Sequence, residues 1–550
     1  MDEKIYDIIL TVIVPVLAAV LWWLAGYAEK VCNSKWRLCW LTPAAIGFLL
    51  LYMSGFEKLM IPAYIAVLIP IAGLLKPERK TRRAASVTSA VLALVSMPLC
   101  LFCSSYRSAD YVRSFKEGFE SMKAHYVLTE HKQVDWDALY DKYLPQFTAA
   151  NNAHDKVANE IAWDKFCAEF HDLHVNYMSD EKTMEAAYKR VSGDDHGLVI
   201  MTLADGRTVA VQVDDSLASL GIHNGTEIIS WNGMTPAEAD KLSERSEMEA
   251  FSDEDNAKFY EGFFAAGTGG DSVEVVFRDD SGTEKTVMLS KISDDYAKRL
   301  EDAYDSVNRG VKTGHMTTKR LNDTTACLRI KTMQFDSISE KDDHKGMQNE
   351  LRQEILKLKE DGVRDIVIDI RENNGGSGSM VKAIAELFAP EGEHYYVSDA
   401  YFDKEKKRYV KESDGSWKVS NDVVFNGENI LGDEGRIVLL VTAHSVSAAD
   451  HLTKVMNDFD NTTVIGFTEP SGSAQGVSPI ELESGTLSYS SSLMLNRDGT
   501  VFLDSGTDMQ SGNTLDIKVP FDEEAVSGLF DEDRDVLLDR SLEYLASLER

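Results

Sequence analysis

A buried strand and the loop behind it decide the fold: Asp365-Ile366-Val367-Ile368-Asp369-Ile370 and Arg371-Glu372-Asn373-Asn374-Gly375-Gly376. The first stretch is a short apolar run, which is typical of a strand that is covered on both faces. The two glycines of the second stretch lack a Cβ, so the backbone can turn sharply there and present N–H groups. We therefore expect a buried parallel strand with a functional loop at its carboxyl end.

Strands and helices alternate on both sides of this stretch. The pattern predicts a strand at 326–331 and a helix at 344–360 before it, then a helix at 380–388 and a strand at 436–442 after it. Such alternation indicates an α/β fold. Open α/β sheets place ligands at the carboxyl ends of their strands, which makes the loop at 445–450 a second candidate.

The chain before this region has a different periodicity. Residues 106–188 are helical in pattern, whereas residues 197–291 favour short strands, and Leu217 to Gly233 resembles the central signature of PDZ domains. By that resemblance, Gly197 and Leu198 would catch a substrate's terminal carboxylate; an ordinary β-hairpin is the alternative. The expected domains of this part are a helical segment at 105–190, a PDZ-like module at 191–292 and an α/β catalytic domain at 293–550.

Composition excludes several classes of protein. The 550 residues are 44% hydrophobic and 27% charged, which excludes a disordered or collagen-like chain. The net charge is −33, and residues after 104 carry 84 acidic against 47 basic side chains, so we expect no nucleic-acid partner. No Cys/His cluster has the spacing of a zinc site, and we expect neither metal nor cofactor.

Four apolar runs open the chain, at about 5–26, 38–54, 59–75 and 84–104. Because a membrane span needs about 20 apolar residues, residues 1–104 are expected to form four transmembrane helices with membrane lipid as a partner. A signal peptide with buried core helices is the alternative. Basic side chains in the first and third loops favour a multi-pass cell-membrane protein with an extracytoplasmic catalytic domain, and the orientation reverses if one short run only dips into the membrane.

Ser447 lies where the second loop enters a helix. A residue there faces the positive end of the helix dipole, and the first N–H groups of the helix have no partner in its ladder. Such donors can hold the oxyanion of a tetrahedral intermediate. The alternative is structural, since Ser is a common helix cap and Asn-Gly-Gly a common turn.

Taken in order, the motifs resemble peptidase family S41, which includes the C-terminal processing (tail-specific) proteases and their tricorn-like relatives. The resemblance rests on the helical segment, the PDZ-like module, the loop at 371–376, Ser445 to Asp450, and Leu515 to Val519. It implies a crotonase-like α/β domain, Ser447 as the nucleophile, and an oxyanion hole formed by the amides of Gly376 and Ala448. Gly375 would bind substrate beside them.

One departure changes the expected mechanism. Many of these peptidases activate the serine with a lysine 25 residues later, but position 472 is Gly and no lysine occurs between Lys454 and Lys518. A lysine dyad is therefore not expected. The tricorn-like branch instead uses a histidine from the helical segment and a later acid, which implies His174 as the base and Asp504 as the residue that orients it.

Alternatives remain for each of these roles. His171 could replace His174, Ser445 could replace Ser447, and Asp504 could be a turn residue. Ser473 is a weaker polar helper, and Asp450 is interpreted as a first-turn acid of the helix. The expected activity is that of a serine endopeptidase acting on polypeptides. The rival hypotheses are a catalytically inactive peptide-binding relative and a membrane sensor; the sequence indicates no oligomeric state.

Overall fold

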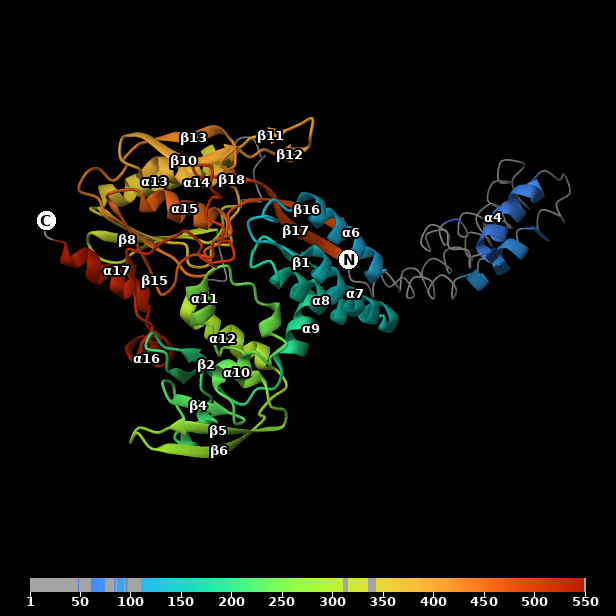
Figure 1. The fold of residues 1–550 in the computed structure, drawn as a ribbon, viewed down its shortest axis with the longest axis horizontal. Coiled ribbons are helices and arrows are strands. Elements are labelled where there is room, and N and C mark those ends of the chain that lie inside the picture. Colours follow the sequence, from blue (N-terminus) through green and yellow to red (C-terminus); the bar gives the residue numbers. More distant parts are fainter. Residues whose placement is uncertain are drawn as a thin grey trace, which may run out of the picture. The chain divides into compact units, whose positions relative to one another are not determined.

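The computed structural model describes residues 48, 61–74, 84–96 (without 86 and 93), 110–309, 315–334 and 343–548. The chain divides into two compact units, Met1–Ala109 and Asp110–Arg550. The second unit contains a helical segment, a five-stranded sheet and a larger α/β region (Figure 1). Every feature of the candidate site lies in this second unit.

The expectation of a four-helix transmembrane region is wrong for the described part of the chain. No helix among the described residues is long and apolar enough to cross a membrane. Helix α4 (Ile61–Leu74) has 14 residues, which at about 1.5 Å per residue reaches about 21 Å, short of about 30 Å of hydrocarbon. The expected location as a multi-pass membrane protein is contradicted by the same finding. The expected span at 5–26, and that at 38–54 apart from Phe48, lie outside the described residues.

A six-stranded sheet forms the centre of the α/β region, in the order β19-β15-β14-β9-β8-β7. Strands β8, β9, β14, β15 and β19 run parallel, and the edge strand β7 is antiparallel to β8. The carboxyl ends of β9 and β14 are neighbours because Ile437 pairs with Ile366 in register. The strands are β7 (Met316–Arg320), β8 (Thr325–Ile330), β9 (Asp365–Asp369), β14 (Ile437–Leu440), β15 (Thr462–Gly466) and β19 (Ile517–Lys518).

Helices cover both faces of this sheet, as the unbroken apolar runs of its strands predict. Side chains on one face of the sheet, such as those of Ile366 and Ile368, pack with α13 (Asp343–Glu360), α14 (Gly378–Phe388) and α15 (Ala448–Asn457). Side chains on the other face, such as those of Val367 and Val438, pack in the core that includes α16 and α17. These two helices span Glu523–Phe530 and Val536–Ser547.

The helical segment is attached to late strands of the chain. Helices α6 (Tyr111–His125), α7 (Trp136–Ala153) and α8 (Lys156–Ala168) share an aromatic core with β16 (Gly476–Leu482) and β17 (Gly485–Ser492). Strand β1 (Asn176–Met178) follows α8 and pairs with β17, with Asn176 opposite Ser488. Helix α9 (Glu181–Ser192) comes next. This pairing brings residues just before β1 to the α/β region.

The five-stranded sheet has the order β2-β3-β4-β5-β6, and all its pairs are antiparallel. The strands predicted within residues 197–291 are present. The strands are β2 (Val199–Thr202), β3 (Thr208–Val211), β4 (Glu227–Trp231), β5 (Ser272–Arg278) and β6 (Glu284–Ser290). The short helices are η4 (Asp215–Leu220), α10 (Pro236–Asp240), η5 (Ser246–Met248), α11 (Glu254–Phe259) and η6 (Ala265–Gly267), and α12 (Tyr296–Asn308) follows the sheet.

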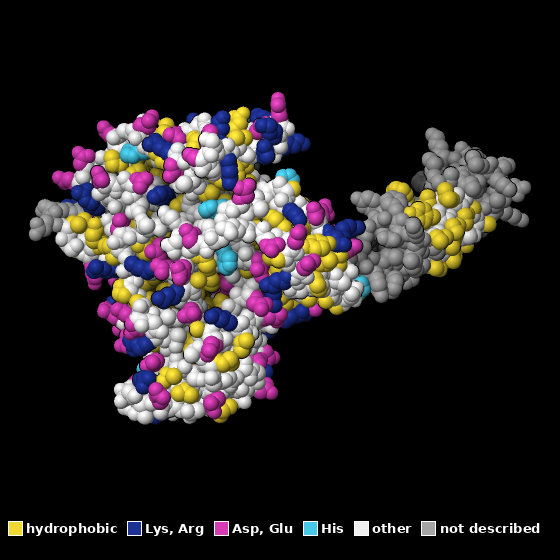
Figure 2. Space-filling model, viewed as in Figure 1, with side chains coloured by type: hydrophobic (Ala, Val, Ile, Leu, Met, Phe, Trp, Pro, Cys, Tyr) yellow, Lys and Arg dark blue, Asp and Glu magenta, His cyan; other side chains and the backbone are white. Residues whose placement is uncertain are grey.

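A third sheet, β13-β10-β18, and a small hairpin were not predicted from the sequence. Basic side chains gather at the hairpin, whereas the rest of the visible face mixes both signs of charge (Figure 2). The elements are β10 (Gly392–Ala400), β11 (Phe402–Asp403), β12 (Arg408–Tyr409), β13 (Val419–Gly427) and β18 (Met494–Leu495).

Candidate active site

The two loops singled out in the sequence lie against each other. The Val446 N–H donates to the Asn373 carbonyl at 3.0 Å, and the Asn373 side chain accepts from the Gly375 N–H at 2.8 Å. Gly375 has φ +87°, and a Cβ there would lie 2.6 Å from the Ser447 Cβ. Glycine is therefore required at 375 by both conformation and space.

Ser447 has an unusual backbone conformation at the start of α15. Its φ is +61° and its ψ −114°, a region that costs a residue with a Cβ about 1–3 kcal/mol. The half-buried side chain lines a cavity of about 1070 Å³, the Ser447 cavity, together with His174, Gly376 and Ala448. The Gly376 and Ala448 amides donate to no acceptor in the described part of the chain, so both are available to an oxygen atom in the cavity.

Asp450 fixes the turn that carries Ser447. Its buried carboxylate accepts five hydrogen bonds, and burial raises its pKa to about 7 against the lowering by these donors. The donors are the N–H groups of Ser447 (2.8 Å), Gly472 (2.8 Å) and Ser473 (3.4 Å), the Ser471 hydroxyl (2.7 Å) and the Asn513 side chain (3.1 Å). Asp450 thus connects the turn at Ser447 with the loop at 471–473. The sequence had suggested only that it is a first-turn acid of the helix.

His174 reaches the cavity from the segment between α8 and β1. The Leu173 N–H donates to the Ser473 hydroxyl and the His174 N–H donates to Asp172, each at 2.9 Å. Both ring nitrogens of His174 are buried and have no hydrogen-bond partner among the described residues, and burial lowers the pKa of the ring. No hydrogen bond joins the ring to the Ser447 hydroxyl in this structure, although both line one cavity. The hydrogen bond between a catalytic hydroxyl and its base is often long or poorly aligned when no substrate is bound.

Two buried carboxyl groups, those of Asp172 and Asp504, interact electrostatically with each other, and the charge of Asp172 also acts on His174. Asp172 accepts from the hydroxyls of Tyr126 (3.0 Å) and Ser490 (2.8 Å), and its charge opposes the lowering of the His174 pKa. Asp504 accepts from the Ala474 N–H (3.0 Å) and the Gln475 side chain (2.9 Å) through one oxygen, and its other oxygen has no partner among the described residues. Burial, followed by the charge of Asp172, raises the pKa of Asp504 to about 8.

The other histidines near Ser447 are held in hydrogen bonds. His451 receives the Tyr396 hydroxyl at Nδ1 (2.8 Å) and contacts the Ala474 carbonyl with Nε2 (2.7 Å). His444 contacts the hydroxyls of Tyr260 and Tyr304. Burial lowers the pKa of His451 to about 4 and that of His444 to about 3, so both rings are neutral near pH 7.

Four further predicted residues lie away from the chemistry. His171 is exposed, contacts the Phe251 carbonyl at 2.9 Å and does not line the Ser447 cavity. The Ser445 hydroxyl is buried and donates to the Ile370 carbonyl at 2.8 Å. In the five-stranded module, the Gly197 N–H donates to Asp195 at 2.8 Å and Leu198 is fully buried.

No lysine is among the described residues that line the Ser447 cavity. Position 472, where many S41 peptidases carry the lysine, has φ +70°, and a Cβ there would lie 2.2 Å from the Ser511 Cβ. The loop therefore has no room for a side chain at this point.

Sequence reasoning missed the contacts of Asp172 and Asp450. Asp172 stands two residues before His174, a spacing at which an Asp side chain can accept a nearby backbone N–H. That local pattern was a usable signal. The partners Ser490 and Asn513 come from distant segments and left no signal in the sequence.

Comparisons with known proteins agree with the geometry. A sequence model described as Peptidase family S41 matches residues 324–512, and one described as the Tricorn protease C1 domain matches residues 108–157. Among solved structures, mature CPAF complexed with lactacystin has a TM-score of 0.49 and 12% identity, covering 80% of this chain and 98% of that chain. The photosystem II D1 C-terminal processing protease has a TM-score of 0.34 and 16% identity, covering 76% and 97%.

The tricorn protease is also similar, with a TM-score of 0.33 and 13% identity, covering 79% of this chain and 36% of that chain. The family matches support a peptidase with a polypeptide substrate. They confirm the predicted resemblance to peptidase family S41, whose model matches residues 324–512.

Proposed function

We propose that this protein hydrolyses peptide bonds as a serine endopeptidase, with Ser447 as the nucleophile and His174 as the base. The observation that carries the proposal is the composition of one cavity. It is lined by a hydroxyl on a strained turn, an imidazole without a partner among the described residues, and the residues of two unoccupied backbone amides. These are the parts that acyl transfer to a serine requires.

In the proposed reaction, His174 accepts the Ser447 proton as Oγ attacks the scissile carbonyl carbon. The carbonyl oxygen becomes an oxyanion, which the Gly376 and Ala448 amides stabilise. The imidazolium then protonates the leaving amine as the C–N bond breaks, which leaves an acyl-enzyme. A water molecule, deprotonated by His174, attacks the ester and releases the second product.

We assign the support of the imidazolium to the buried pair of Asp172 and Asp504. Two adjacent carboxyl groups do not both ionise readily in a buried site, so the pair holds a proton at neutral pH, on Asp504. The charge of Asp172 raises the pKa of His174 and so favours its protonated form. In this proposal Asp504 interacts with Asp172, and it is Asp172 whose charge acts on His174.

The test compares wild type with Ser447→Ala and Ser445→Ala. We expect a fluorophosphonate probe to label wild type and Ser445→Ala but not Ser447→Ala, and only the two labelled proteins to cleave denatured casein. Circular dichroism confirms that each variant is folded. Labelling of folded Ser447→Ala, or none of wild type, would refute the assignment. Absence of labelling with retained peptide binding would favour an inactive peptide-binding relative.

A further inference from the structure

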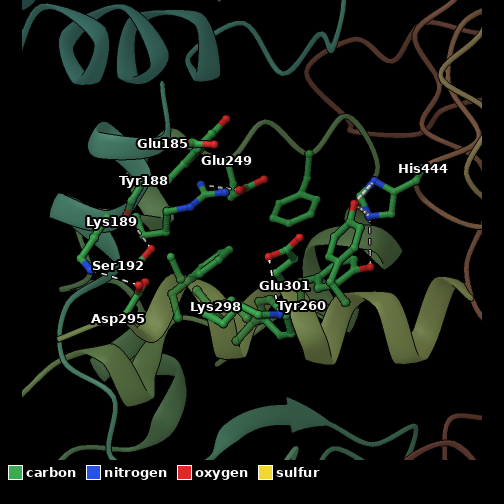
Figure 3. Close-up of a pocket in the computed structure, with 17 residues that line it drawn as sticks. Glu185, Tyr188, Lys189, Ser192, Glu249, Tyr260, Asp295, Lys298, Glu301 and His444 are labelled. Carbon is green, nitrogen blue, oxygen red and sulfur yellow. Dashed lines mark hydrogen bonds and ion pairs between the residues drawn. The ribbon is translucent and has the colours of Figure 1, made fainter. Parts of the chain in front are cut away.

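A second cavity, of about 620 Å³, adjoins the Ser447 cavity. Its walls come from α9, the segment at 245–264, α12 and the loop before Ser447. Figure 3 shows His444 at one end and Lys189 with Asp295 at the other. The volume is within the range of about 300–1,000 Å³ that is typical of ligand sites. We name it the aromatic cavity because rings form much of its lining; these are Tyr188, Phe251, Tyr260, Phe263, Phe264, Tyr304 and His444.

The two cavities are continuous. Five residues line both, namely Tyr188, Arg245, Glu249, Tyr304 and His444. His444 is three residues before Ser447 in the same loop. Because three residues span at most about 10 Å of chain, the cavity opens within about 10 Å of the nucleophile. An extended polypeptide at Ser447 thus reaches it within about three residues of the scissile bond.

Most charged groups at this cavity form ion pairs, whereas the exposed Glu185 forms none with the described residues. Lys189 pairs with Asp295 at 3.0 Å, Arg245 pairs with Glu249, and Lys298 pairs with Glu301 at 3.8 Å and with Asp302. Phe251 stacks on Tyr260 with ring centroids 5.7 Å apart, and Arg245 covers the ring of Phe264 at 5.1 Å. Apart from the exposed Glu185, the surface left between these pairs is largely apolar, which favours a neutral and bulky occupant.

We infer that the aromatic cavity is a specificity subsite that binds a large apolar side chain, aromatic or aliphatic, of the polypeptide bound at Ser447. The inference rests on the proposed peptidase function and adds the class of substrate to it. Burial of such a side chain against the rings removes its apolar surface from water. Binding energy at this distance from the scissile bond helps to position the peptide for attack.

Ala297 gives a way to fill the cavity. It is half-buried on α12 and lines the aromatic cavity, so Ala297→Trp adds bulk without removing core contacts. Asp305→Trp is the matched control, because Asp305 is also half-buried on α12 but does not line the cavity. Lys298→Trp, at an exposed rim position, serves as a second filling variant if Ala297→Trp does not fold.

The experiment first sequences by mass spectrometry the products that each protein makes from reduced, denatured casein. Two synthetic peptides are then built on a site that wild type cleaves, with Phe or Ala at the preferred position. We expect wild type to prefer Phe over Ala about tenfold or more in kcat/KM. The filling variants should lose that preference, and their ratio of peptide kcat/KM to fluorophosphonate labelling rate should fall at least tenfold. Asp305→Trp should keep both values.

Two outcomes separate the subsite from the peptidase itself. The subsite alone is refuted if wild type reacts with the probe and cleaves casein but shows no apolar preference within three residues of the scissile bond. It is also refuted if the preference persists after the cavity is filled. If wild type neither labels nor cleaves, the proposed function fails and the subsite fails with it.

Discussion

Asp450→Ala tests whether the nucleophile turn depends on one buried carboxylate. The substitution removes the acceptor of five hydrogen bonds that connect Ser447 with the loop at 471–473 and with Asn513. Three of the donors are backbone N–H groups, which cannot rotate away to find other partners. The position is fully buried, so bulk water does not replace the lost acceptor.

The expected magnitude follows from these donors. Each buried donor left without a partner costs about 1–3 kcal/mol, and the Ser473 N–H, at 3.4 Å, contributes least. Entry of water and movement of the loop offset part of this sum. We therefore expect the free energy of unfolding to fall by about 3–5 kcal/mol. The turn at Ser447 should also loosen, and we expect the fluorophosphonate labelling rate to fall about 100-fold, as for a displaced catalytic group.

Urea denaturation followed by tryptophan fluorescence measures the first quantity, and time-resolved labelling of the folded protein measures the second. Asp458→Ala is the control, because Asp458 is exposed at the other end of α15 and should change stability by less than about 0.5 kcal/mol. An Asp450→Ala protein within about 1 kcal/mol of wild type that labels at the same rate would refute this account of the turn.

Three further predictions concern the base, its acids and the loop contact. Burial lowers the pKa of His174 below its usual 6.5, and the ring must be neutral to act as a base. We therefore expect kcat/KM to stay level down to a pH below 6.5 and then to fall. A fall in kcat/KM that begins at or above pH 6.5 would contradict this prediction. Asn copies the protonated form of Asp504, so Asp504→Asn should lose less than about tenfold in kcat at pH 7, whereas Asp172→Asn should lose about 100-fold. In Gly375→Ala, the added Cβ overlaps Ser447, and labelling should be lost in a protein that circular dichroism shows to be folded; a normal labelling rate would contradict the close contact between the two loops.

The parallel sheet could be predicted because its strands are short apolar runs with turns on both sides. Residues 365–369 are buried throughout, as a strand covered on both faces requires. Strand β10 was missed because its first residues are exposed and its pairing with β13 depends on a bulge between Tyr395 and Val397. Such a strand has neither a continuous apolar run nor a regular alternation.

The candidate site could be predicted only in part. The order of the motifs pointed to Ser447, Gly376 and His174, but the sequence could not distinguish Asp172, whose charge raises the pKa of His174, from Asp504. That distinction depends on β1 pairing with β17, a contact between segments about 300 residues apart. Apolar length alone misled the interpretation of this region, because no helix among the described residues, α4 included, is long and apolar enough to cross a membrane.

The loop at 471–473 has a structural role in place of the lysine that many S41 peptidases carry there. Gly472 packs against Ser511, which leaves no room for a side chain at this position. The Gly472 N–H, the Ser471 hydroxyl and the Ser473 N–H all donate hydrogen bonds to Asp450. Ser473 then accepts the Leu173 N–H and so fixes the backbone next to His174. The segment that elsewhere supplies the base here joins the nucleophile turn to a base from the helical segment. Under the proposed function, docking of the helical segment, through β1 and its aromatic core, is therefore a condition for catalysis.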